Sequence, residues 1–160
     1  MGIRMTTSTS AIDRLFKKSF EIIKNEIFMA FTKLGEECVV KIRDRSQDKS
    51  WYDHTSNLRS SIGYAIYDYG VKQIESAFNV VGSGSQGSTE GKRMVEQLAR
   101  EYTNTFALVV IAAMNYAEYV EAIEGKDVLA STELWAKAEV DKRLQRAKES
   151  AIRKINALQI

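Results

Sequence analysis

Residues 60–80 read SSIGYAIYDYGVKQIESAFNV, and their pattern indicates a sheet at the centre of the chain. Its first part, residues 60–68, is rich in isoleucine and tyrosine, which is typical of a β-strand. The Tyr69-Gly70 pair then predicts a turn, and residues 74–80 alternate in the manner of a second strand. The stretch therefore predicts a hairpin whose alternating side chains are Ile62, Tyr64 and Ile66 in one strand and Ile74, Ser76, Phe78 and Val80 in the other.

A third strand is predicted further along the chain. Residues 105–113, TFALVVIAA, are apolar at almost every position, so we expect a central strand that is covered on both faces. Residues 82–91, GSGSQGSTEG, have the composition of a flexible Gly/Ser loop. Short helices are predicted on either side of the third strand, over residues 92–102 and 115–124.

Two long helices flank this sheet in the sequence. Apolar residues recur every three or four positions from Ser10 to Arg45, and again from Thr132 onwards, which is the period of an amphipathic helix. The first helix would be about 50 Å long and needs a sheet or a neighbouring subunit to lie on. The two stripes are Ile12, Phe16, Phe20, Ile23, Ile27, Phe31, Leu34, Cys38 and Ile42, and then Val140, Leu144, Ala147, Ala151, Ile155 and Leu158.

These elements predict one α+β domain over residues 1–160, with residues 1–9 as a flexible N-terminus. Its fold would be a long N-terminal helix, a small antiparallel sheet of three or four strands with a short inserted helix, and a long C-terminal helix. At 18.1 kDa the chain is long enough to bury a core without a metal or disulfide staple. The longest apolar run, residues 106–114, is too short to span a bilayer, so no membrane partner is expected.

The formal net charge of +2 hides an uneven distribution. Residues 1–50 carry +3, residues 51–130 carry −4 and residues 131–160 carry +3. This is too little positive charge to predict nucleic-acid binding. It does indicate complementary surfaces that meet head to tail between subunits.

No constellation in the sequence predicts catalysis. Gly82–Gly87 matches G-x-G-x-x-G, but the strand that follows ends without the acid that binds a ribose, so a plain loop is favoured. Asp53, His54, Thr55 and Ser56 are adjacent, whereas catalytic triads are assembled from separated segments. Cys38 lies on the apolar stripe and is expected to be a buried hydrophobe. We therefore expect no enzyme activity, cofactor or metal.

Two charged patterns leave alternatives open. Glu118, Glu121, Glu124 and Asp127 recur three residues apart, which suits either acid–base chemistry or, more simply, an edge that faces a partner. The basic face of the last helix, with Arg143, Arg146 and Lys154, suits either a solvated surface or an oligomeric nucleic-acid-binding protein. The second alternative is weakened because aromatic residues are not interleaved with these charges.

Two stretches together resemble a known family. They are residues 51–66, WYDHTSNLRSSIGYAI, and residues 107–129, ALVVIAAMNYAEYVEAIEGKDVL. They resemble the neck and tail-component proteins of long-tailed bacteriophages, which are head–tail joining or tail-completion proteins of the minor tail protein Z type. That pattern has Asp-x-Thr-Gly-x-Leu-x-x-Ser-Ile before a strand and Tyr-Ala-x-Tyr-Val-Glu with a later Gly. The matching residues are Asp53, Thr55, Asn57, Leu58, Arg59, Ser60, Ser61 and Ile62, and then Tyr116, Ala117, Tyr119, Val120, Glu121 and Gly125.

The resemblance covers most of residues 10–156, with Ser56 and Ala113 at positions where the family commonly has Gly. It implies a non-enzymatic virion protein at the neck or tail, made in the host cytoplasm and forming a ring of subunits, often with six-fold symmetry. Other neck and tail proteins would be its partners, and nucleic acid would be met only as DNA passing through the ring. Trp51 suits a core anchor as well as an interface. We expect the interface residues to be Trp51, Tyr52, Asn57, Arg59, Tyr116, Tyr119, Glu121 and Glu124, together with the loop over 82–91.

Overall fold

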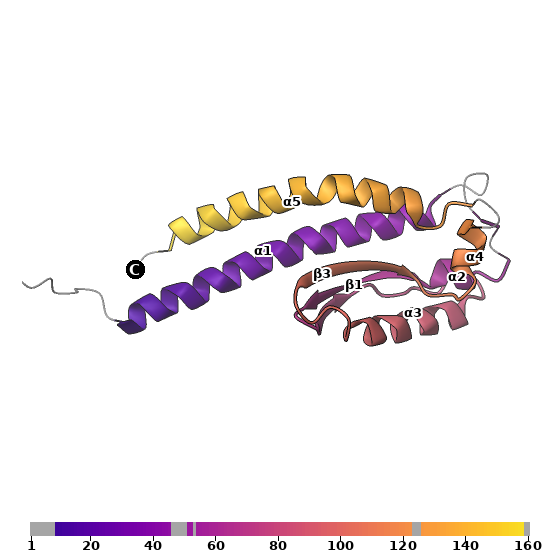
Figure 1. Cartoon of the computed structure of the whole chain (residues 1–160), viewed down its shortest axis with the longest axis horizontal. Helices are drawn as coiled ribbons and strands as arrows, with labels where there is room; N and C mark the ends of the chain where they lie inside the picture. Colours follow the sequence, from indigo (N-terminus) through magenta and orange to yellow (C-terminus); the bar gives the residue numbers. More distant parts are fainter. Residues whose placement is uncertain (1–8, 46–50, 53, 123–125, 159–160) are drawn as a thin grey trace, which may run out of the picture. The chain divides into compact units, whose positions relative to one another are not determined.

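The computed structural model describes residues 9–45, 51–52, 54–122 and 126–158. The chain divides into two compact units, residues 1–30 with 140–160 and residues 31–139. The predicted α+β class is confirmed, whereas the single domain stays a prediction. The elements are α1 (Thr9–Arg43), α2 (Asn57–Ser60), β1 (Ile62–Asp68), β2 (Val71–Glu75), α3 (Ser85–Leu98), β3 (Phe106–Ala112), α4 (Ala117–Ala122) and α5 (Ala130–Asn156) (Figure 1).

The sheet of the larger unit has the strand order β2-β1-β3, with both pairs antiparallel. The predicted hairpin is confirmed, since Ile66 pairs with Ile74 across it, and Ile66 also pairs with Leu108 on β3. The prediction that the third strand is central is wrong. β1 is central and buried from Ile62 to Tyr67, whereas β3 pairs with β1 alone among the described strands and is half-buried along most of its length.

The second strand is shorter than predicted, ending at Glu75 rather than Val80. The physical reason lies at Phe78, whose φ of 46° is in the left-handed region and is incompatible with a continuing strand. The Phe78 ring is fully buried after this change in backbone direction. The alternating pattern over residues 74–80 therefore combines the end of β2 with a buried residue, Phe78, that lies beyond the strand.

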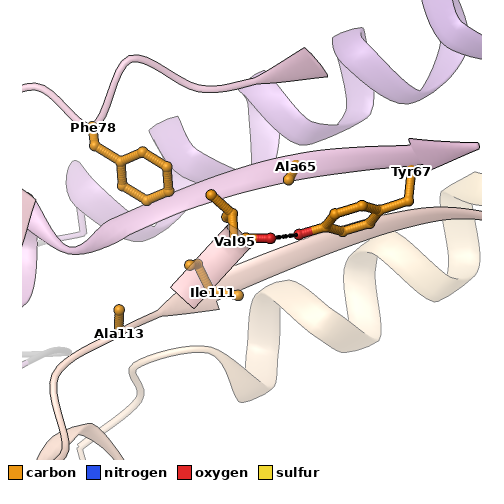
Figure 2. Close-up of a cluster of buried hydrophobic side chains, with 6 residues drawn as sticks. All are labelled: Ala65, Tyr67, Phe78, Val95, Ile111 and Ala113. Carbon is orange, nitrogen blue, oxygen red and sulfur yellow. Dashed lines mark hydrogen bonds between the residues drawn. The ribbon is translucent and has the colours of Figure 1, made fainter. Parts of the chain in front are cut away.

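The main core lies between the sheet and α3 (Figure 2). Its buried members are Ala65, Tyr67, Phe78, Val95, Ile111 and Ala113. The Tyr67 hydroxyl donates a hydrogen bond to the Val95 carbonyl at 2.6 Å, which ties β1 to α3. The buried phenol therefore keeps a partner, as buried polar groups require.

The opposite face of the sheet is covered by the C-terminal part of α1 (Figure 1). A Cβ atom at Gly35 would lie 2.6 Å from the Tyr64 ring, so only glycine permits this approach of helix and strand. The Tyr64 hydroxyl donates to Glu36 Oε1 at 2.8 Å. Because Tyr64 faces α1 and Ala65 faces α3, β1 is covered on both sides, which explains its continuous burial.

Helix α3 begins at Ser85, seven residues before the predicted start at Lys92. The prediction of a loop is therefore wrong for residues 85–91. Gly87 and Gly91 lie inside the helix, where added Cβ atoms would collide with the Asn57 carbonyl and the Phe78 ring. These glycines serve close packing of α3, a role that composition alone does not distinguish from flexibility.

The apolar stripe of α1 differs between the two units. In the larger unit Phe31, Leu34, Cys38 and Ile42 are buried, as predicted for Cys38. In the smaller unit Phe16 and Phe20 leave 61% and 70% of their surface exposed, and Ile23 is also exposed. There α1 contacts α5 through an ion pair between Glu26 and Lys154. None of the described helices is long and apolar enough to cross a membrane.

Candidate interaction site

The two stretches that carry the resemblance meet in the larger unit. They enclose a cavity of about 340 Å³, which we call the α2–α4 cavity. One wall comes from the chain around α2 and the other from the start of α4. The lining residues are Trp51, Tyr52, His54, Thr55, Leu58, Tyr116 and Val120.

Trp51 and Leu58 are the buried members of this lining, and Trp51 has only 2% of its surface exposed. The Arg59 guanidinium lies over its ring, 5.4 Å from the centroid, in a cation–π contact. The structure therefore places Trp51 as a core anchor. Its Nε1–H is buried and has no hydrogen-bond acceptor among the described residues.

Exposed aromatic side chains surround the cavity. Tyr52 is 65% exposed, and its ring meets the His54 ring edge-on at 4.4 Å between centroids. Tyr116 lines the cavity from the other side, and Tyr119 on α4 is 54% exposed. Exposed tyrosines are common anchors of protein interfaces, so the surface itself remains a candidate contact.

The polar residues of the first motif hold neighbouring elements together. Asn57 Oδ1 accepts a hydrogen bond from the Gly87 N–H at 3.0 Å, and Ser60 Oγ accepts one from the Val81 N–H at 2.9 Å. Ser61 Oγ accepts one from the Ala113 N–H at 3.1 Å. Ser56 adopts a φ of 59°, a left-handed conformation that glycine adopts without strain, and the motif that the sequence resembles commonly has Gly at this position.

Glu121 forms hydrogen bonds within the chain, whereas the sequence predicts it on an edge that faces a partner. Its Oε1 accepts hydrogen bonds from the Leu129 N–H at 3.0 Å and the Ala130 N–H at 2.7 Å. The first N–H groups of a helix lack partners within it, and a carboxylate there is favoured by the helix dipole. Glu121 therefore caps the start of α5, whereas Glu118 is exposed. Glu124 lies outside the described residues.

Sequence reasoning missed Arg45, which fastens the same helix start. Its Nη1 donates to the Asp127 carbonyl at 2.6 Å and lies 2.7 Å from Asp127 Oδ1. Its Nη2 donates to Ser131 Oγ and Thr132 Oγ1, both at 2.8 Å. Burial alone would raise the pKa of Asp127, but hydrogen bonds from Ser131 and the Arg45 charge lower it overall. We call this group the Arg45 clamp.

The structure gives less support to the alternative sites, which are a nucleotide site at the Gly-rich start of α3, the basic face of α5 and a metal site. The start of α3 is occupied by Asn57, whose side chain bonds to the Gly87 N–H that a phosphate would need. On α5, the Lys154 ammonium pairs with Glu26, Arg143 is half-buried and Arg146 is exposed. Among the described residues, no group of three or more His, Cys, Asp or Glu side chains is placed to hold a metal ion.

The arrangement offers a surface for binding, with exposed tyrosine rings beside a cavity that is lined by apolar and polar side chains. The His54 ring contacts the Tyr52 ring. Among the described residues, the His54 imidazole forms no hydrogen bond with a Ser or Thr hydroxyl that could act as a nucleophile. No known family model matches the sequence, and neither a curated protein nor a solved structure matches the chain.

Proposed function

We propose that this chain is a structural virion protein of a tailed bacteriophage, a ring-forming subunit that joins head and tail or completes the tail at the neck. One observation carries the proposal. The two motifs that resemble the neck and tail-component proteins, far apart in sequence, both line the α2–α4 cavity. They therefore belong to one surface, as a shared interaction role requires.

The exposed stripe on α1 supports an assembling protein. Phe16, Phe20 and Ile23 follow one another at helical spacing and are exposed. With residues of α5 they line a second cavity, of about 570 Å³, which includes Leu15, Ile155 and Leu158. Large exposed apolar patches mark interaction sites on soluble proteins. A ring subunit would cover this face in the virion.

Nucleic-acid binding through α5 ranks second. The Glu26 carboxylate neutralises Lys154 in part, and the hydrogen bond with Lys154 lowers the pKa of Glu26. A phosphate contact would have to replace that pair. If the alternative is correct, binding to DNA is strong at low salt and falls steeply as salt rises.

Electron microscopy of a phage that lacks this gene tests the proposal. Packaged heads beside free tails are expected for head–tail joining, and tails of abnormal length or with unfinished ends for tail completion. Normal infectious particles would overturn both.

Complementation then tests the surface. A Tyr52→Ala and Tyr119→Ala double variant is expected to restore far fewer infectious particles than the unaltered gene. Tyr69→Ala is the matched control, because Tyr69 is similarly exposed but lies in the β1–β2 turn. Equal rescue by the double variant and the control would exclude this surface.

A further inference from the structure

The smaller unit holds an apolar groove between two antiparallel helices. There α1 and α5 run side by side in opposite directions (Figure 1), and together they line the cavity of about 570 Å³. Phe16, Phe20 and Ile23 form its exposed apolar row on α1. Ile155 of α5 and Leu158 just after it are half-buried and line the other side. All the lining residues belong to the smaller unit, so the groove is complete within it.

The shape of the groove suits a third helix. Phe16 and Ile23 are seven residues apart, which corresponds to about 10 Å along the axis of α1, or two helical turns. An amphipathic helix that binds in a groove presents its apolar anchors at the same spacing, i, i+3 or i+4, and i+7. A membrane-bound helix instead lays one apolar face flat on the bilayer surface. The hollow between α1 and α5 therefore favours a helical protein segment over a lipid surface.

Positive charge surrounds this groove. Residues 9–30 and 140–158, the described part of the smaller unit, carry 10 Lys and Arg but only 5 Asp and Glu, a net charge of +5. Lys17 and Lys24 lie three residues before and four residues after Phe20, so they follow the same side of α1 as its ring. Asp13, one turn before Lys17, offsets only part of this charge. Acidic side chains seven residues apart on a bound helix would meet both lysines.

The described helices that lie wholly in the larger unit do not offer such a segment. α3 packs its apolar residues into the core, and α2 and α4 span only four and six residues. A second copy of the groove itself would bring a like charge, which opposes pairing. The occupant is therefore expected on a different protein.

We propose that the groove between α1 and α5 binds an amphipathic helix of another virion protein, which covers Phe16, Phe20 and Ile23 with its apolar stripe and places acidic side chains beside Lys17 and Lys24. This deepens the proposed function and rests on it only for the source of the helix. The apolar contact supplies most of the affinity, because it removes exposed aromatic surface from water. The opposite charges select the partner and speed its association.

Fluorescence anisotropy of labelled peptides with the full chain tests this. The first probe is an alanine-based helical peptide with leucines at the spacing of Phe16, Phe20 and Ile23 and glutamates on both sides of that stripe. The second has lysine in place of each glutamate, and the third has alanine in place of each leucine. We expect the glutamate peptide to bind saturably and about tenfold more tightly than the lysine peptide at low salt, with a smaller preference at high salt. The peptide without leucines should not bind.

Charge reversal in the chain supplies the control. Lys17→Glu with Lys24→Glu should invert the preference, so that the lysine peptide binds more tightly than the glutamate peptide. Arg14→Glu with Lys18→Glu makes the same change in net charge at exposed positions on the other side of α1, and should keep the original order. The order of the three peptides on the unaltered chain decides the proposal even if a variant fails to fold.

Three results would overturn the proposal. They are equal binding of the glutamate and lysine peptides or no binding of either, binding to phosphatidylserine vesicles in preference to the glutamate peptide, and self-association of the purified chain that Phe20→Ser abolishes. These measurements use the purified chain and synthetic probes. Their failure would therefore leave the phage experiment untouched, and normal particles from the deleted phage would overturn only the proposed function.

Discussion

The Arg45 guanidinium lies 2.7 Å from the Asp127 carboxylate and joins the end of α1 to the start of α5. The two residues are 82 positions apart. The Arg45 side chain is 12% exposed, so water screens the pair only weakly. The same guanidinium also holds Ser131 and Thr132, so one side chain fixes the first turn of α5.

Arg45→Ala is expected to lower the free energy of unfolding by about 2–4 kcal/mol, because it leaves the half-buried Asp127 carboxylate without its cation. Chemical unfolding followed by circular dichroism measures this change. Arg93→Ala is the matched control, since Arg93 pairs with Glu90 on the exposed surface of α3. Its expected cost is about 0–1 kcal/mol. Equal losses for the two variants would refute the importance of the clamp.

The Asp127 carboxylate makes the clamp sensitive to acid. Its pKa in the folded chain is lowered, so its contribution is fully present above the unfolded pKa of about 3.9. That contribution is lost as the pH falls through the folded pKa. The melting temperature of the unaltered chain should therefore exceed that of Asp127→Asn at pH 7, and the difference should shrink progressively as the pH falls below about 4. A constant difference across this range would contradict the assignment.

Tyr67 should titrate far later than an exposed tyrosine. Burial, followed by the nearby negative charge of Glu96, raises its pKa to about 12. The unfolded chain ionises near pH 10, so the contribution of Tyr67 to stability falls as the pH rises between these values. Absorbance titration at alkaline pH should lose a late-titrating phenol in Tyr67→Phe.

Removing the same hydroxyl should also weaken the fold at neutral pH. Tyr67→Phe deletes the donor to the Val95 carbonyl and is expected to cost about 1–2 kcal/mol. Tyr69→Phe, at an exposed turn, is the control and should leave stability unchanged. A Tyr67→Phe variant as stable as the control would mean that this bond contributes nothing net.

Local patterns were sufficient to predict most elements but not their neighbours. The period of the stripe in α1 and the composition of β1 depend on nearby residues, so the sequence displays them. Strand order depends on which strands pair edge to edge, and β1 is central because it pairs with both β2 and β3. Its burial depends on distant contacts, since Tyr64 packs on Gly35 of α1 while Tyr67 bonds to α3. Neither the pairing nor these contacts leave a signal in the strand itself.

In the candidate site, too, the sequence identifies some of the residues but not the contacts that they make. Tyr52 and Tyr119 are predicted interface residues; both are exposed, and their contact with a partner stays a prediction. The role of Glu121 was not predictable, because its partners Leu129 and Ala130 contribute backbone N–H groups that every residue type carries. The Gly-rich start of α3 misled for a related reason: glycine signals close contact as readily as flexibility.

Gly87 offers a test in which two effects have opposite signs. Gly→Ala inside a helix normally stabilises by about 1 kcal/mol. At Gly87 the added methyl group would collide with the Asn57 carbonyl, so Gly87→Ala is expected to destabilise by about 1–3 kcal/mol. Gln86→Ala, at an exposed position of the same helix, should stay within about 0.5 kcal/mol of the unaltered chain. Thermal unfolding of both variants measures the difference, and a stabilised Gly87→Ala would refute the close contact.

The exposed stripe of α1 predicts a loss of assembly without a loss of folding. Phe16 and Phe20 have most of their surface exposed, so a Phe16→Ser and Phe20→Ser double variant removes little burial within the chain. Its melting temperature should stay close to that of the unaltered chain. If α1 packs on a neighbouring subunit in the virion, the double variant loses the apolar contact between the two subunits. Complementation of the deleted phage should then give far fewer infectious particles.

Arg14→Ser with Lys18→Ser is the matched control, because both residues are exposed and lie on the other side of the same helix. This control should restore infectivity as well as the unaltered gene does. Normal infectivity of the phenylalanine variant would exclude the stripe as an assembly contact. A large fall in its melting temperature would instead show that Phe16 and Phe20 stabilise the subunit itself. Because the two readouts are independent, the experiment separates a role in folding from a role in the particle.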